Sequence, residues 1–395
     1  WHLCPTDEMN LASTRRNWPS GRGFERWYGF LGAETSQWYP ELVYDNHAVD
    51  QPSLPEDGYH FSVDITDKAI EFVRDAKAVA PEKPFFLYYS PGACHAPHHA
   101  PKEWIDKFKG QFDMGYEEMR EQTLARQKEM GIVPEDTVLP PINPIGTSET
   151  RQGPDGQPFS PVDVTRPWDS LSPEEQQLFA RMAEVYAGFL AHADHQIGRL
   201  LDFLEFIGER DNTLIMLVSD NGASGEGGPD GSVNEMMFMN GIPDDIDANL
   251  AMIDELGGPK TYNHYPNGWA MAFNTPFKMW KRYEFEGGTA DPCIVSWPAG
   301  MEARGELRTQ YHHAIDLVPT VLDALGVTAP SSIKGTTQSH FDGVSMRYSF
   351  DDESAAGERT TQFYSMLGSR GIWHDGWKAV TTHPTISGWG NFNDD

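Results

Sequence analysis

The chain has 395 residues, of which 39% are hydrophobic and 23% charged, a composition typical of a globular protein. This excludes wholesale disorder, collagen and a coiled coil. Lys and Arg number 30 against 59 Asp and Glu, so the formal net charge is −29, and nucleic acids and anionic membranes would repel the chain. An anionic substrate would need a locally positive site, which a bound divalent cation could supply. No run of 18 or more apolar residues occurs, so no transmembrane helix is predicted.

The first third of the chain predicts loops, one helix and one strand. Residues 1–58 are rich in Trp, Gly and Pro, which indicates short elements around a site. A helix is predicted from about Asp64 or Thr66, followed by an apolar run of strand length at 84–90 that suits a buried strand. Residues 108–172 are predicted to form an insertion that contains a charged helix at 116–130.

The clearest helix signal in the chain follows the insertion. Ser172 and Glu175 match a capping box, with Pro173 at the first helical position. Apolar residues then recur at helical spacing as far as Leu204.

Further strand signals alternate with loops and helices. Apolar runs at 214–219 and 293–297 predict two more buried strands, separated by a long excursion at 223–276 with one short helix around 244–256. A helix is predicted at 314–325, closed by Gly326. Strands at 361–367 and 371–382 then predict an antiparallel pair.

This order of elements predicts an α/β fold, with a mainly parallel (mixed) sheet sandwiched between helices. We expect the main unit to span 1–330 and a smaller, incomplete α+β part to span 331–395. Ligands of such sheets bind beyond the carboxyl ends of the strands. Functional side chains are therefore expected at that edge.

Asp220 and Asn221 directly follow the apolar run at 214–219. A carboxylate and an amide carbonyl are hard oxygen ligands, which suit Ca²⁺ or Mg²⁺ better than zinc. The alternative is an ordinary turn, because Asp-Asn-Gly is a common turn sequence.

A histidine cluster follows the run at 84–90, beginning with His95. Zinc ligation is conceivable, but no matching second pair of ligands is visible, and a His-rich surface loop is the alternative. Lys281 precedes a Gly-Gly turn at 287–288, which lets backbone approach a ligand; a solvated lysine is the alternative. His2 says little by itself.

The ordered combination of these features resembles the sulfatase family of the alkaline phosphatase superfamily, and most strongly the large bacterial arylsulfatases with their long insertions. The resemblance spans essentially the whole chain. It rests on these segments in order: Trp1-His2-Leu3, His95-x-Pro97, Ser219-Asp220-Asn221-Gly222, and Lys281 followed by Glu286-Gly287-Gly288 and Pro292.

The resemblance implies hydrolysis of sulfate esters by a formylglycine nucleophile, made from Cys or Ser by a formylglycine-generating or an anaerobic maturation enzyme. It implies that Asp220 and Asn221 bind Ca²⁺, or alternatively Mg²⁺, and that His2 assists sulfate release. His95 and Lys281 would contact the ester oxygen and the sulfate. These roles are chemically sensible, since a cation and a lysine neutralise sulfate and histidine transfers protons near neutral pH.

The sequence also departs from the family. No Cys or Ser begins the nucleophile motif C/S-x-P/A-x-R, the N-terminal Asp-Asp pair and the Gly-Lys before Trp1 are missing, and Ala290 replaces a frequent Arg. Apart from this Arg, these features lie in the family upstream of the position where this chain begins. We therefore expect a fragment truncated at both ends, inactive alone, with exposed strand edges.

Two alternative functions stay open: a phosphonate or phosphate monoester hydrolase of the same superfamily, and a non-catalytic sulfo-ligand-binding homologue. His264, Tyr265 and Trp269 are candidates for binding the alcohol part of the substrate, and the alternative is that they anchor a long loop. The expected partner is a small sulfate ester. A soluble protein of the cytoplasm or periplasm is expected.

Overall fold

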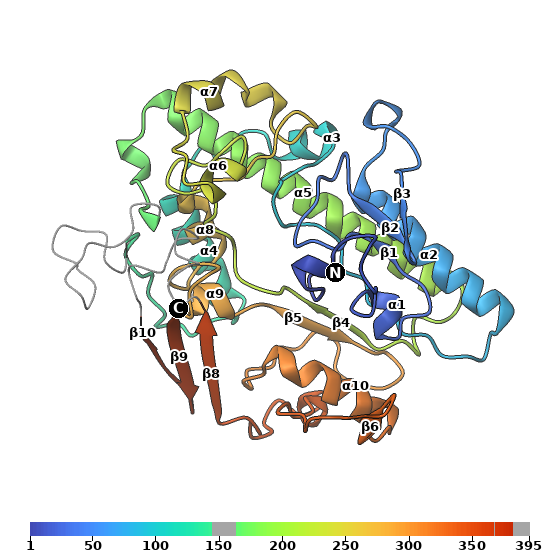
Figure 1. Ribbon diagram of the computed structural model, residues 1–395. Helices are drawn as coiled ribbons and strands as arrows, with labels where there is room; N and C mark the ends of the chain where they lie inside the picture. Colours follow the sequence, from blue (N-terminus) through green and yellow to red (C-terminus); the bar gives the residue numbers. More distant parts are fainter. Residues whose placement is uncertain (144–162, 367, 382–395) are drawn as a thin grey trace.

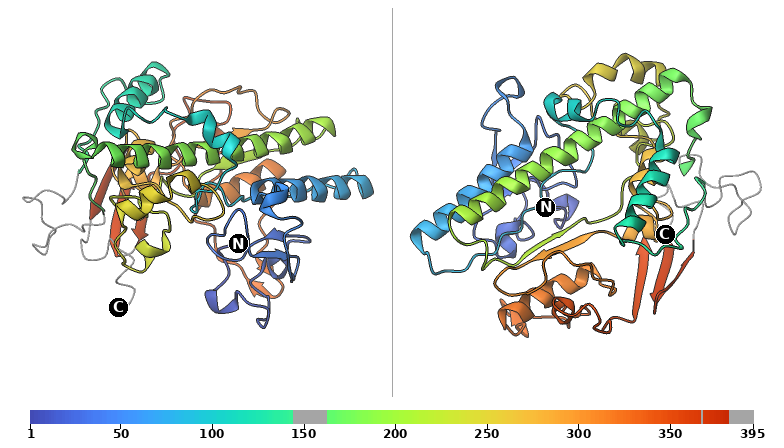
Figure 2. Two further views of the ribbon diagram at one scale, coloured as in Figure 1. Left: turned by 90° about the horizontal axis from the view of Figure 1, so that it is seen from above. Right: turned by 180° about the vertical axis from the view of Figure 1, so that it is seen from behind.

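The computed structural model describes residues 1–143, 163–366 and 368–381. The Pro/Gly-rich part of the expected insertion, 144–162, and the end of the expected C-terminal part, 382–395, lie outside the described residues. A long helix, α5 (Pro173–Phe206), crosses the molecule beside α2 (Phe61–Val79), and the small sheets lie around them (Figures 1 and 2).

The capping box predicted at the start of α5 is confirmed. The Ser172 hydroxyl accepts a hydrogen bond from the Glu175 N–H, and the Glu175 carboxylate accepts one from the Ser172 N–H. Two backbone donors that helix geometry leaves unpaired are thereby satisfied. Pro173 occupies the first helical position, and the helix ends before Gly208, which adopts a φ of 74°.

The main hydrophobic core lies between α5, α4 (Tyr116–Glu129) and α8 (Asn267–Phe273). Trp269 is its centre, with a ring that is 0% exposed and an Nε1–H that donates to the Phe179 carbonyl at 2.8 Å. Burial of one such side chain stabilises the fold by about 2 kcal/mol. This core connects the excursion at 223–276 firmly to α5.

The start of α2 was predicted wrongly. The helix begins at Phe61, because the side chain of His60 serves as N-cap and its Nδ1 accepts a hydrogen bond from the Ser62 N–H. Histidine is not among the usual N-cap residues, so this cap could not be recognised from the sequence. Asp64, one of the expected caps, lies inside the helix and accepts hydrogen bonds from Tyr28 and Tyr59.

Two of the predicted buried strands form, but they pair with each other in antiparallel orientation. β4 (Ile215–Val218) pairs with β5 (Cys293–Ser296), Val218 opposite Cys293. Because a long excursion rather than a single crossover helix connects them, nothing imposes the parallel direction that we expected. The run at 84–90 is extended but belongs to no strand.

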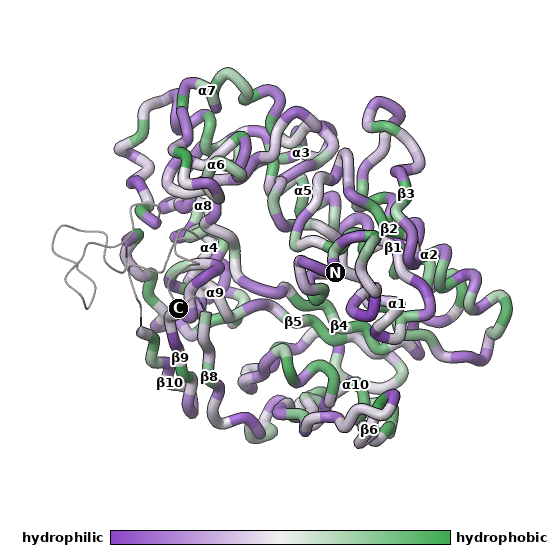
Figure 3. Tube along the Cα trace, viewed as in Figure 1, coloured by the Kyte–Doolittle hydropathy of each residue, from purple (hydrophilic) through white to green (hydrophobic). Residues whose placement is uncertain are grey.

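The two strands are also less buried than their sequences suggest. Apolar residues line both strands (Figure 3), yet Val218 is 42% and Ile294 60% exposed. Each strand has one partner among the described residues, so the second edge of each is unpaired there. This arrangement explains why their uniformly apolar sequences, typical of central strands, do not produce burial here.

The C-terminal part is a three-stranded antiparallel meander of β8 (Thr361–Met366), β9 (Ser369–His374) and β10 (Trp377–Thr381). The expected second strand is therefore divided in two. The division falls at Asp375-Gly376, where both residues have positive φ, 44° and 86°, as the favoured two-residue hairpin turns require.

The remaining elements are short. The predicted helix 314–325 is confirmed as a 3₁₀ turn followed by α10 (Leu317–Leu325), which ends at Gly326 in the left-handed region. No helix in the described ranges combines the length and the apolarity needed to cross a membrane. The other helices and strands are α1 (Pro19–Arg22), β1 (Tyr28–Gly29), β2 (Leu42–Tyr44), β3 (His47–Val49), α3 (Lys102–Ile105), α6 (Met236–Met239), α7 (Ile246–Ala251), α9 (Glu286–Thr289), β6 (Ser332–Ile333) and β7 (Thr336–Thr337).

Buried histidines are a feature of the interior. Burial disfavours the charged ring and lowers the pKa of His99, His192 and His264 to about 4. The ring of His192 packs 4.6 Å from that of His60, and its Nε2 lies 3.1 Å from the Gln196 amide nitrogen. These rings are neutral in the folded protein at neutral pH.

Replacing His192 with Gln is predicted to weaken the acid sensitivity of the fold. The unfolded state binds a proton at this residue below about pH 6.5, the folded state only below about pH 4, so stability is lost as pH falls between these values. At pH 5 the loss for one such histidine is about 2 kcal/mol. Urea unfolding at pH 7 and pH 5 should show a smaller decrease in His192→Gln than in the parent. Equal decreases would contradict this.

Candidate active site

Two of the predicted catalytic residues meet although 186 positions separate them. The Lys281 ammonium donates to Nε2 of His95 at 3.0 Å. The backbone of Lys281 is fixed on the loop after β4, since its N–H donates to the Ala223 carbonyl at 3.0 Å. His95 Nδ1 lies 2.8 Å from the Ala96 carbonyl. The ring therefore carries its proton on Nδ1 and accepts from Lys281 on Nε2.

Glu226 completes this cluster, and the sequence did not indicate it. Its carboxylate accepts from Lys281 at 2.9 Å, and its side chain is 1% exposed. Burial is the largest single effect and alone would raise the pKa of Glu226, but the charge of Lys281, its hydrogen bond and the more distant His264 and Arg282 together lower the pKa to about 2. Glu226 is thus an ionised carboxylate in the interior, paired with a lysine at the site.

Two further carboxyl groups, those of Glu34 and Glu235, lie near this cluster. Glu34 is 3.4 Å from His95 Nδ1 and accepts from the Tyr262 hydroxyl at 3.0 Å. Glu235 is 0% exposed, and its carboxyl group lies beside that of Glu34. Burial and the nearby charge of Glu34 raise the pKa of Glu235 well above its usual range. Burial therefore favours the protonated form of Glu235.

The predicted metal ligands lie at the end of β4, as expected. Asp220 is exposed, while Asn221 donates from its amide nitrogen to the Gly222 carbonyl at 2.9 Å and leaves its Oδ1 available. Gly222 packs so closely on α9 that an added Cβ would lie 1.8 Å from the Gly287 carbonyl oxygen. The two glycines at 287–288, predicted as a turn, lie inside α9, and their lack of side chains lets the loop after β4 come close to Lys281.

Asp291 is a further carboxylate at this edge that the sequence did not indicate. Continuing the β4–β5 register beyond Val218 and Cys293 places Asp291 opposite Asp220. Burial and the negative charge of Asp220 raise the pKa of Asp291 to about 7. Hard oxygen donors of this kind fit Ca²⁺ or Mg²⁺. No group of three or more His, Cys, Asp or Glu in the described ranges is arranged to hold a metal.

The other predicted site residues differ in their placement. His2 is exposed and makes no hydrogen bond or ion pair in the described part of the chain, and the N-terminal ammonium of Trp1 anchors the segment to the Phe30 carbonyl at 2.6 Å. His264 is 0% exposed, with Nδ1 2.7 Å from the Tyr265 carbonyl. The burial of His264 and Trp269 favours the alternative that they anchor the loop rather than contact the substrate.

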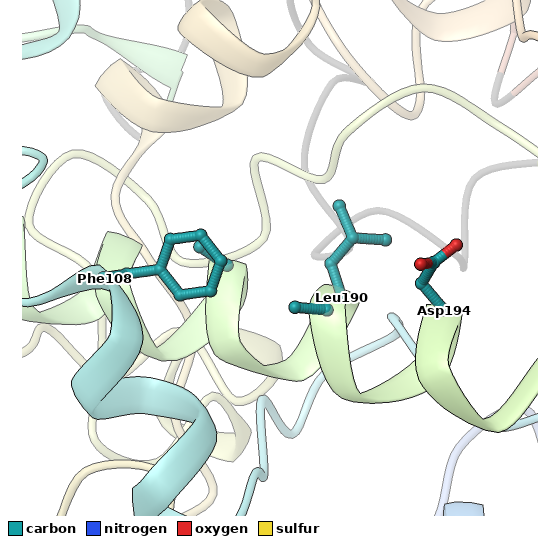
Figure 4. A pocket seen from close by; sticks show the side chains of 5 residues that line it. Phe108, Leu190 and Asp194 are labelled. Carbon is teal, nitrogen blue, oxygen red and sulfur yellow. The ribbon is translucent and has the colours of Figure 1, made fainter. Parts of the chain in front are cut away.

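A hollow on the surface lies away from these residues. It measures about 390 Å³ and lies against the outer face of α5 (Figure 4). Its lining is mostly apolar, and Asp194 is the charged residue in it. Without a second chemical group to act with Asp194, the hollow is a weaker candidate than the His95–Lys281 cluster. Its lining residues are Phe108, Ala187, Leu190, Ala191 and Asp194.

Comparison with known proteins identifies the family of the chain. A family model described as Sulfatase matches residues 2–327. The chain belongs to the sulfatase family. It is 28% identical over 345 residues to an uncharacterized sulfatase of Schizosaccharomyces pombe, covering 84% of this chain and 57% of the relative. It is 28% identical over 325 residues to an arylsulfatase of Klebsiella aerogenes, covering 80% and 63%. The chain thus spans less than two thirds of the length of these sulfatases.

The fold of a solved sulfatase is also similar. The structure of the PsFucS1 sulfatase from Pseudoalteromonas sp. matches with a TM-score of 0.51 at 16% identity, covering 94% of this chain and 56% of that one. This likeness confirms the predicted α/β, alkaline-phosphatase-like fold class. The predicted division at residue 330 stays a prediction.

Proposed function

We propose that this chain is part of an enzyme of the arylsulfatase type, which hydrolyses sulfate esters. The observation that supports this most is the contact of Lys281 with His95, beside the Asp220-Asn221 loop and inside a chain of the sulfatase family. Its similarity to the Klebsiella arylsulfatase favours an aryl ester. A fixed ammonium next to a histidine and hard oxygen ligands is an arrangement that binds and polarises a tetrahedral anion.

Each residue then has a role that follows from its contacts. Lys281 donates to a sulfate or ester oxygen with the N–H that has no partner among the described residues. His95 receives or returns a proton at Nε2, because its Nδ1 proton is held by the Ala96 carbonyl. The proposed role of His2 is assistance in sulfate release. Asp220 and Asn221 would hold the divalent cation.

The proposal includes two groups from outside the described residues. The cation, Ca²⁺ or Mg²⁺, supplies positive charge that lowers the energy of the anionic transition state. The nucleophile is a formylglycine produced by a maturation enzyme from an upstream Cys or Ser, because the sequence holds no C/S-x-P/A-x-R motif.

The first prediction concerns the metal. Asp220→Ala removes a charged oxygen ligand, so the active protein should lose its cation and its turnover together. Elemental analysis of dialysed protein should show at least a tenfold lower content of Ca²⁺ and Mg²⁺. Asp211→Ala, an exposed carboxylate just before β4, is the matched control and should retain metal. Unchanged metal content in Asp220→Ala would refute the assignment.

The second prediction concerns the leaving group. If His95 and Lys281 stabilise charge on the ester oxygen, His95→Asn and Lys281→Met should reduce kcat/KM most for aryl sulfates with poor leaving groups. The measurement is kcat/KM across phenols of increasing pKa. An equal loss across the series would instead mean that both residues only bind sulfate.

The third prediction concerns residues 1–395 expressed alone. The described site contains acids, bases and a lysine but no nucleophile of the required kind, so no turnover of an aryl sulfate above background is expected. Coexpression with a formylglycine-generating enzyme should not change this. Turnover that disappears in Lys281→Ala would overturn the proposed nucleophile.

A further inference from the structure

Glu226 is immobilised by contacts other than that with Lys281. Its Oε2 accepts from the Ser224 hydroxyl at 2.9 Å, and its backbone N–H donates to the same hydroxyl oxygen at 3.1 Å. The Ser224 N–H in turn donates to the hydroxyl of Tyr265, a ring that is 1% exposed. The carboxylate therefore has a fixed place in the interior.

Lys281 projects between Glu226 and His95. Two of its three N–H groups donate to these residues, at 2.9 and 3.0 Å, and its side chain is 16% exposed. Both partners are acceptors, so together they determine the direction of the third N–H. A lysine side chain is otherwise flexible and presents its ammonium in many directions.

We propose that Glu226 is a positioning residue that fixes Lys281 against His95 and thereby aims its remaining N–H at the bound sulfate group. The sulfate part of this statement rests on the proposed function. Burying this ion pair is unfavourable in part, because removing both charges from water costs free energy that their mutual attraction does not always offset. A carboxylate next to an anion-binding lysine also repels the anion. Its contribution is therefore direction rather than attraction.

Repulsion of the anion by the carboxylate and positioning of Lys281 by the same carboxylate predict opposite changes in sulfate affinity for Glu226→Gln. If only charge mattered, removing the carboxylate would strengthen anion binding. If Glu226 positions Lys281, the variant should bind inorganic sulfate about tenfold more weakly, as should Lys281→Met. The double variant should also bind about tenfold more weakly, because the two residues act through one contact. Titration calorimetry with inorganic sulfate in calcium-containing buffer measures this.

Tighter binding by Glu226→Gln, or a hundredfold loss in the double variant, would overturn the positioning role. The matched control is Glu255→Gln, which removes a surface carboxylate 2.8 Å from Lys260, with side chains 41% and 66% exposed. It should leave sulfate binding unchanged. If the parent binds no sulfate, the sulfate role of Lys281 fails, and the labelling experiment below then decides the positioning role alone.

Chemical labelling tests the positioning of Lys281 without reference to function. Pulse acetylation followed by mass spectrometry should label Lys281 at least fivefold faster in Glu226→Gln than in the parent, with the other lysines unchanged. Glu255→Gln should change only Lys260. An unchanged rate at Lys281 would refute the proposal. Faster labelling at all lysines would refute it too, because it would show that Glu226 only supports the fold.

Discussion

The buried contact of Glu226 with Lys281 is the constraint on which the rest of the site depends. It joins the loop after β4 to the segment before α9 and, through Lys281, to the histidine loop at 95. Removing Lys281 would take this ion pair away from a carboxylate that stays buried, which is costly. Glu226 also accepts a hydrogen bond from Ser224, so the fold fixes the position of its carboxylate. The carboxylate in turn determines the direction of the Lys281 ammonium.

Glycines allow these segments to approach each other. At Gly222 an added Cβ would lie 1.8 Å from the Gly287 carbonyl oxygen, and at Gly225 it would lie 2.2 Å from the indole nitrogen of Trp280. Any side chain at either position would push the loop away from the 280–288 segment. The same close approach lets the Lys281 N–H reach the Ala223 carbonyl. These glycines therefore permit the close packing of the loop after β4 against the 280–288 segment rather than the approach of a ligand.

The sequence predicted the elements better than the contacts among them. The α5 capping box and the strands that end before Asp220 are local patterns, so both were found. The N-cap His60 was missed because later residues, Asp64 and Thr66, are more usual helix caps. The turn at Asp375-Gly376 was missed because the residues around it match one continuous strand. Glu226 and Asp291 gave no signal, because the chain holds 59 Asp and Glu and their partners are remote in sequence. Whether two strands pair in parallel or antiparallel orientation depends on the path of the chain between them, and the spacing of apolar residues does not reveal that path.

The charges around Lys281 are mostly negative. Glu34 and Glu226 are carboxylates, burial favours the protonated form of Glu235, and His95 accepts a hydrogen bond from Lys281. One lysine against two carboxylates leaves the cluster negative, within a chain whose net charge is −29. Asp220 adds further negative charge at the end of β4. In the proposed function, this negative charge repels a sulfate ester, and a divalent cation at Asp220 would offset that repulsion.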